Sequence, residues 1–224
     1  MSNAPKKESE AEATDVRTQI LRAATRLFAE RGFDGTPLQA IADEVEIAKA
    51  SLLYHFPSKE ELRTAVLDQL MSHWNEVLPR LLEAATTGEH RFDSLIDEVV
   101  GFFTADPDRA RLLVREMLDR PDELEMLFRQ YLGPWMNILS DYIRRGQKEG
   151  RVYADLDPEA YILQIIHLVV GGIAIGDVIE SLLEPDDARQ QVGRRQLEEL
   201  IRVARSSLFI EPQAAFSTEL SSPQ

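Results

Sequence analysis

The 224-residue chain has no cysteine, which excludes disulfides, cysteine-ligated zinc and a thiol nucleophile. It also lacks an apolar run long enough to cross a bilayer, which takes about 20 mostly apolar residues. The most apolar stretch, residues 161–179, is interrupted by Gln164, His167 and Asp177. The first 14 residues lack the apolar segment of a signal peptide. We therefore expect a cytoplasmic protein with no membrane contact.

Positive charge is also scarce, since the formal net charge is −14. Residues 14–64 hold seven basic and eight acidic side chains, whereas residues 65–224 hold 16 basic and 28 acidic ones. Phosphate repulsion would keep the acidic part away from a nucleic acid, so only the N-terminal segment could face DNA. The acidic part is either ordinary solvated surface or a region that favours a cationic ligand.

Helical periodicity runs through the chain, and no segment alternates with period two between turn residues. The sequence predicts an all-α fold of about nine helices, the first from about Asp15 to Arg31 with Thr14 as its N-cap. Hydrophobic residues make up 44% of the chain, enough for a core. We expect a disordered tail over residues 1–13, a three-helix domain over 14–62, a second helical domain over 63–210 and a flexible tail over 211–224.

Capping signals mark where the helices after the first three begin. Ser58 with Glu61, Asp106 before Pro107, and Asp157 before Pro158 are typical helix starts. Pro121 opens a helix that we expect to stop near residue 146 or 150. The helix after Asp157 is expected to reach about residue 183, and a last helix to begin at residue 185.

Two short helices around residues 36–56 form a predicted helix-turn-helix. Thr36 is expected to cap the second helix, with Pro37 at its first position and Gln39 completing a capping box. The second helix would cover 37–45 and the third about 48–54.

The third helix offers side chains for reading DNA. A recognition helix places its N-terminal residues against base edges, here Lys49, Ala50 and Ser51. Lysine can donate to guanine, and a small apolar side chain can meet a thymine methyl. Phosphate contacts are expected from the donors Tyr54, His55 and Lys59, and from the Thr36 hydroxyl and backbone N–H.

This segment resembles the DNA-binding domain of TetR-family repressors. The similarity runs from Ile20 to about Val66 and is most specific in the run LYHFPSKEEL, residues 53–62. The resemblance implies an all-helical ligand domain whose last two helices form a four-helix bundle with a second copy. It also implies DNA contacts at Thr36, Gln39, Lys49, Ala50, Ser51, Tyr54, His55 and Lys59.

Three positions depart from the family pattern. Glu46 stands where a glycine is common in the turn, Ala48 replaces a capping serine or threonine, and Leu53 replaces a frequent tyrosine. The first two predict a weaker turn, because loss of an N-cap costs roughly 1 kcal/mol. Leu53 makes the groove-facing surface more apolar.

The sequence also indicates a homodimer without help from the resemblance. The segment 162–179 is apolar on nearly all sides, so one side can meet its own core and another needs a partner. A two-fold dimer would place two recognition helices about 34 Å apart, one turn of DNA. The expected interface residues are Ile165, Val169, Gly172, Ile173, Gly176, Leu197, Leu200, Ile201 and Ala204.

Aromatic and other large side chains of the second domain are candidates for lining an apolar effector pocket. For each, core packing is the plain alternative; Trp135 and His167 are preferred because each carries a polar tip on a mostly apolar helix. The candidates are Trp74, Phe103, Met117, Phe128, Tyr131, Trp135, Tyr142 and His167. The four histidines show no metal-ligand spacing, so no metal or cofactor is expected.

These features predict a homodimeric repressor that is released from double-stranded operator DNA by an unknown small-molecule effector, and that is no enzyme. Two alternatives stay open. A helical-bundle carrier or enzyme would need a catalytic constellation, and the sequence has no HExxH motif, no phosphate-binding glycine loop and no paired ExxH motif. A regulator with the same DNA-binding domain and no effector pocket is the second.

Overall fold

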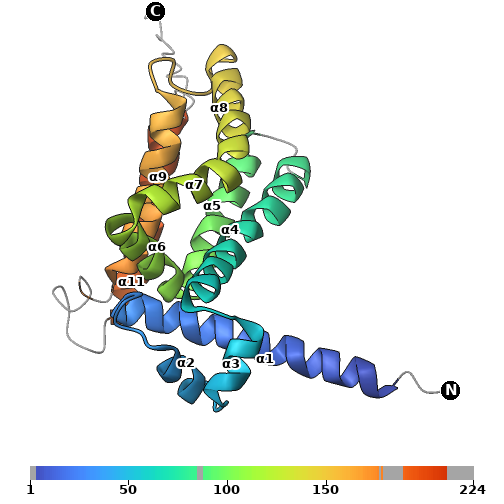
Figure 1. Cartoon of the computed structure of the whole chain (residues 1–224). Helices are drawn as coiled ribbons and strands as arrows, with labels where there is room; N and C mark the ends of the chain where they lie inside the picture. The colour runs from blue at the N-terminus through green and yellow to red at the C-terminus, as the bar shows by residue number, and fades with distance from the viewer. Residues whose placement is uncertain (1–3, 85–87, 177, 179–188, 211–224) are drawn as a thin grey trace, which may run out of the picture.

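Ten helices make up the part of the chain described by the computed structural model, residues 4–84, 88–176, 178 and 189–210 (Figure 1). The predicted all-α class is confirmed; within these residues the extended pairing is a single bridge between Val152 and Phe209. The helices are α1 (Ala4–Arg31), α2 (Leu38–Glu44), α3 (Lys49–His55), α4 (Lys59–Ala84), α5 (Gly88–Thr104), α6 (Pro107–Asp119), α7 (Pro121–Tyr131), α8 (Gly133–Lys148), α9 (Pro158–Ala174) and α11 (Arg189–Leu208).

The first helix is longer than predicted. It begins at Ala4 instead of Asp15, so the predicted disordered tail is helical from residue 4 and Thr14 lies within the helix. The segment is rich in alanine, glutamate and lysine, which are strong helix formers, and extending a helix costs less than starting one. This part of α1 projects beyond α2 and α3 in Figure 1.

The three predicted caps that follow α3 are confirmed. The Glu61 N–H donates to Ser58 Oγ at 3.0 Å, and the Ala160 N–H donates to Asp157 Oδ1 at 2.9 Å. Asp106 accepts from the Asp108 N–H at 3.3 Å. These side chains satisfy backbone donors that the first turn of a helix leaves free, and they fix where α4, α6 and α9 begin.

Two predicted helices end early. The single helix expected from Pro121 is divided into α7 and α8, because Pro134 lacks the N–H that would continue the helix and its ring opposes the carbonyl four residues back. The helix after Asp157 stops at Ala174, where Ile175 leaves helical geometry with ψ near 3°. The predicted start of the last helix at residue 185 and the tail after residue 210 lie outside the described residues.

Two hydrophobic cores meet along α4. The head core joins α1, α2, α3 and the start of α4, and includes Leu62, Val66 and Leu67. The body core joins α4 to α11 and begins on α4 at Leu70. The predicted domain boundary after residue 62 therefore falls inside one continuous helix, which ties head and body together.

Candidate functional site

The short helices α2 and α3 lie against α1 at one end of the molecule (Figure 1). Ile41, Ala42 and Leu52 have no exposed surface and hold the pair against α1. With this side buried, the other side of α3 turns outward. Lys49 and Ala50 are exposed there, and the Tyr54 side chain is 83% exposed. These side chains are therefore accessible from solvent on the outward side of α3.

The turn between α2 and α3 is strained at Glu46, whose φ is +58°. The Ile47 N–H donates to the Ala42 carbonyl at 3.0 Å and the Glu46 N–H to the Asp43 carbonyl at 3.2 Å. This pair of hydrogen bonds ends a helix through a residue in the left-handed conformation, usually glycine. A residue with a Cβ costs about 1–2 kcal/mol in that conformation. The departure from glycine noted in the sequence therefore has a conformational cost.

The predicted role of Thr36 is wrong. The N-cap of α2 is Pro37, and the Thr36 side chain is fully buried. Its hydroxyl lies within hydrogen-bond distance of two carbonyl oxygens, that of Gly32 at 2.7 Å and that of Leu27 at 3.0 Å. Its backbone N–H donates to the Phe33 carbonyl. Both donors are used inside the protein, so Thr36 closes the turn after α1 and is not available to a phosphate.

The other predicted DNA contacts keep exposed surface. Gln39 is exposed and donates to Asp43 Oδ1 at 2.6 Å, one turn along α2, so it does not complete a capping box. Ser51 and His55 are half-buried, with the His55 ring edge-on to Tyr54 at 5.4 Å. The Lys59 ammonium lies 4.3 Å from the Phe33 ring centroid. Their contact with DNA remains a prediction.

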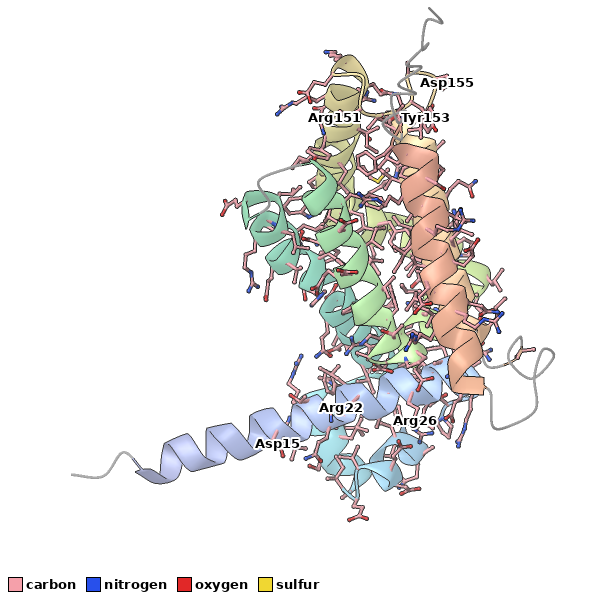
Figure 2. The ribbon with its side chains drawn as sticks, turned by 180° about the vertical axis from the view of Figure 1, so that it is seen from behind. Asp15, Arg22, Arg26, Arg151, Tyr153 and Asp155 are labelled. Atoms are coloured by element: carbon pink, nitrogen blue, oxygen red, sulfur yellow. The ribbon has the colours of Figure 1, made fainter. Side chains whose placement is uncertain are left out.

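One cation near this surface was missed. The Arg17 guanidinium on α1 lies 4.9 Å from the ring centroid of Phe56, the residue that ends α3. Figure 2 shows α1, with Asp15, Arg22 and Arg26 along it, at the end of the molecule opposite Arg151, Tyr153 and Asp155. The sequence alone does not single out Arg17, because its proximity to α3 depends on how α1 crosses α2 and α3.

The body contains an apolar cavity of about 180 Å³, partly open to solvent, between α4, α5, α8, α9 and α11. Four of the predicted pocket residues line it: Trp74, Phe103, Trp135 and Tyr142. Met117, Phe128 and Tyr131 pack against the body core and do not line this cavity. The Tyr131 hydroxyl donates to Asp68 Oδ1 at 3.1 Å instead.

His167 is also misplaced by the prediction, because it is exposed on the outer side of α9. Tyr161, one and a half turns earlier, is the polar-tipped residue of α9 that does line the cavity. Its hydroxyl donates to the Ala204 carbonyl at 2.6 Å, and burial raises its pKa, so the phenol stays neutral. Because α9 is apolar on most sides, its pattern does not distinguish the inward side from the outward one.

The dimer residues expected from the sequence lie mostly against the core of one protomer, and their contact with a partner remains a prediction. Ile165, Val169 and Ala204 are buried within one protomer, and Gly176 is half-buried. Four others pack partly buried against the protomer's own core: Ile173, Leu197, Leu200 and Ile201. Only Gly172 among the nine is exposed. The apolar side chains that α9, its continuation and α11 expose are Leu163, Leu168, Ile175, Val178 and Val203.

A buried ion pair joins the head to the body. The Arg63 guanidinium on α4 donates to Glu116 on α6, with Nε 2.9 and 3.0 Å from the two carboxylate oxygens, and also pairs with Glu123 on α7. Burial would lower the pKa of Arg63, but hydrogen bonds with the two glutamates outweigh it and raise that pKa. Close by, Arg115 donates to the Ala29 carbonyl at 2.9 Å at the end of α1.

Among the described residues, no helix combines the length and apolar character needed to cross a membrane. The same residues contain no group of three or more histidine, aspartate or glutamate side chains arranged to hold a metal ion.

Comparison with known proteins gives the family. Residues 20–66 match the model described as bacterial regulatory proteins, tetR family, and residues 89–203 match the tetracyclin repressor-like C-terminal domain. The HTH-type transcriptional repressor KstR2 of Rhodococcus jostii is 30% identical over 151 residues, 64% of this chain and 71% of that protein. The HTH-type transcriptional regulator RutR of Escherichia coli is 32% identical over 152 residues, 65% of this chain and 68% of that protein.

The solved structures agree on the fold. The ketosteroid transcriptional regulator KstR2 of Mycobacterium tuberculosis has a TM-score of 0.65 at 20% identity, covering 87% of this chain and 95% of that one. The resemblance seen in residues 20–66 is thus confirmed and extends to the body. Regulators of this family bind operator DNA as dimers and respond to small-molecule effectors. The chain belongs to the TetR family of helix-turn-helix transcriptional regulators.

Proposed function

We propose that this regulator is a repressor that places the exposed side of α3 in the major groove and leaves its operator when a small molecule fills the body cavity. The observation that carries the first part is the outward surface of α3, with Lys49, Ala50 and Tyr54 exposed on it. The second part is supported by an apolar cavity of about 180 Å³ whose wall includes α4, the helix that also begins in the head.

The proposed contacts divide into two groups. Lys49, Ala50 and Ser51 occupy the start of α3, where a recognition helix meets base edges. Tyr54, His55 and Lys59 follow along the same surface and suit phosphates, and Arg17 joins them from α1. Phosphate contacts fix the position of the head, whereas base contacts select the sequence.

The dimer is proposed to form through the outer side of α9 and α11. Leu163, Leu168 and Val203 are 48%, 44% and 39% exposed in one protomer. Gly172 lies on the exposed side of α9 and has open space around the position of a Cβ, so a partner helix could approach closely. A two-fold axis through this surface would present two α3 helices to one side of a DNA duplex.

The link between cavity and head is proposed to be α4. Trp74 and Leu78 on α4 line the cavity, and Lys59 and Arg63 at the start of the same helix face the head and the junction. A ligand that shifts α4 would therefore change the placement of α3. Coupling of two sites requires such a shared element with two arrangements.

We also propose that the protein acts in the cytoplasm and catalyses no reaction. The relatives KstR2 and RutR are regulators, and the described residues of the cavity wall carry no acid–base pair. A helical carrier without a DNA target is the competing function; it would leave the exposed side of α3 without a role.

The test is operator binding by fluorescence anisotropy, with DNA first selected by the purified protein from genomic fragments. Lys49→Ala should weaken binding by about tenfold or more and alter sequence preference, since a good base contact contributes about 1–3 kcal/mol. Lys59→Ala should weaken all sequences alike and reduce the salt slope by about one. Lys148→Ala, exposed at the end of α8, is the matched control and should bind unchanged. Unchanged binding by both head variants would contradict the contact surface.

A further inference from the structure

The wall of the body cavity is uncharged. Nineteen described side chains line it, and all are aliphatic, aromatic or methionine. Two of its polar tips are engaged within the protein: Trp135 Nε1 donates to Asn75 Oδ1 at 2.8 Å, and the Tyr161 hydroxyl donates to the Ala204 carbonyl at 2.6 Å. A ligand inside the cavity would therefore meet hydrocarbon on nearly every side.

Such a wall rejects ions. A charged group that leaves water for an apolar site loses its hydration and needs a partner of opposite charge and further hydrogen bonds. Residues 65–224 are acidic overall, which had left a cationic ligand as an alternative. None of their described acidic side chains lines this cavity, so a cation inside it would have no counterion. The aromatic rings could attract a cation by their faces, but that attraction is smaller than the loss of hydration.

The volume sets the size of the occupant. An apolar cavity of about 150 Å³ holds one benzene molecule. This cavity of about 180 Å³ therefore accommodates one six-membered ring with a small substituent. A ligand of several fused rings would extend out of the cavity or need the walls to move apart.

We propose that the effector is an uncharged, largely hydrocarbon molecule about the size of one substituted six-membered ring. The inference rests on the proposed function, in which the ligand that fills this cavity is the effector that releases the operator. Its polar content is limited to one neutral group, since the Trp135 and Tyr161 donors of the wall already have acceptors within the protein.

The chain carries its own reporter for this ligand. It has two tryptophans, Trp74 and Trp135, and both line the cavity. Cyclohexanol, cyclohexanecarboxylate and cyclohexylammonium share one ring, differ in charge at neutral pH and do not absorb where tryptophan does. Titrating each into the full-length protein, we expect saturable change in tryptophan emission with cyclohexanol and at least about tenfold weaker binding of both ions. Equal or tighter binding of either ion, or no saturable change with cyclohexanol, would overturn the inference.

Filling the cavity provides the second test. Leu95→Trp adds a ring to the wall, and Leu118→Trp places the same substitution on α6 where the side chain is 77% exposed. Calorimetry should show at least tenfold weaker cyclohexanol binding to the first variant and unchanged binding to the second. If Leu95→Trp does not fold, Leu139→Trp, on α8 and also in the cavity wall, is the filling variant to be measured. Full binding by a folded filling variant would contradict the inference.

Operator release separates this inference from the proposed function. If cyclohexanol binds in the cavity and the operator complex persists, the ligand class stands and the cavity is not the switch. If cyclohexanol releases the operator without changing the emission of either tryptophan, the ligand acts elsewhere and the inference is wrong.

Discussion

Replacing Glu116 by glutamine would remove one charge from the junction between head and body. The Arg63 and Glu116 side chains are 6% and 5% exposed, and two bonds of 2.9 and 3.0 Å from Arg63 Nε hold them together. Glutamine has nearly the same shape and keeps one acceptor oxygen. The variant therefore tests the charge of the pair and leaves packing almost unchanged.

The expected loss follows from what remains around Arg63. Removing one partner of a buried pair costs about 3–5 kcal/mol when the other charge is left alone. Here Arg63 keeps Glu123, whose side chain is 47% exposed and so compensates only in part. We therefore expect Glu116→Gln to lower the free energy of unfolding by about 2–3 kcal/mol.

Urea unfolding at one fixed protein concentration measures this difference, because the stability of a dimer depends on concentration. Glu125→Gln is the matched control: its pair with Arg129 on α7 is exposed on both sides and should contribute less than about 1 kcal/mol. Equal losses for Glu116→Gln and Glu125→Gln would refute the idea that burial makes the junction pair stabilising.

Three further predictions follow from single positions. Glu46→Gly should raise the free energy of unfolding by about 0.5–1 kcal/mol, because relief of the left-handed strain exceeds the entropy that glycine adds to the unfolded chain; urea unfolding of this variant beside Glu46→Ala measures it. Leu168→Asp should dissociate the dimer in sedimentation velocity, whereas Leu118→Asp should not; a dimer in both would contradict the proposed surface. The hydrogen bond from Arg63 lowers the pKa of Glu123, so the stabilisation by this pair is present at neutral pH and is lost as the pH falls through that lowered pKa. Glu123→Gln should therefore make the melting temperature less dependent on pH in the acid range. An unchanged dependence would argue against the pair.

Local signals in the sequence predicted the helix starts well. Ser58, Asp106 and Asp157 cap the helices that they were expected to cap, because a capping bond involves residues two or three apart and needs no distant partner. The strain at Glu46 could also be foreseen, since the turn needs a left-handed residue at that position. Pro134 carried an equally local signal, and it divides α7 from α8.

Properties that depend on distant residues were predicted less well. Thr36 has the residue type of an N-cap, and only the packing of its turn on the end of α1 shows that its hydroxyl faces inward. Val169 and Leu168 are adjacent apolar residues on α9, yet one is fully buried and the other 44% exposed. On a helix that is apolar all round, the contacts of neighbouring helices decide which side becomes core and which becomes surface.

The central claim is that α3 reads DNA from each half of a dimer. Selection of bound sequences from a random DNA library with the full-length protein tests it most directly, with a Lys49→Ala, Tyr54→Ala double variant beside it. The account predicts an inverted repeat whose half-sites are centred about 34 Å apart, and loss of that enrichment in the variant. An unpaired motif, or the same enrichment from the double variant, would contradict it.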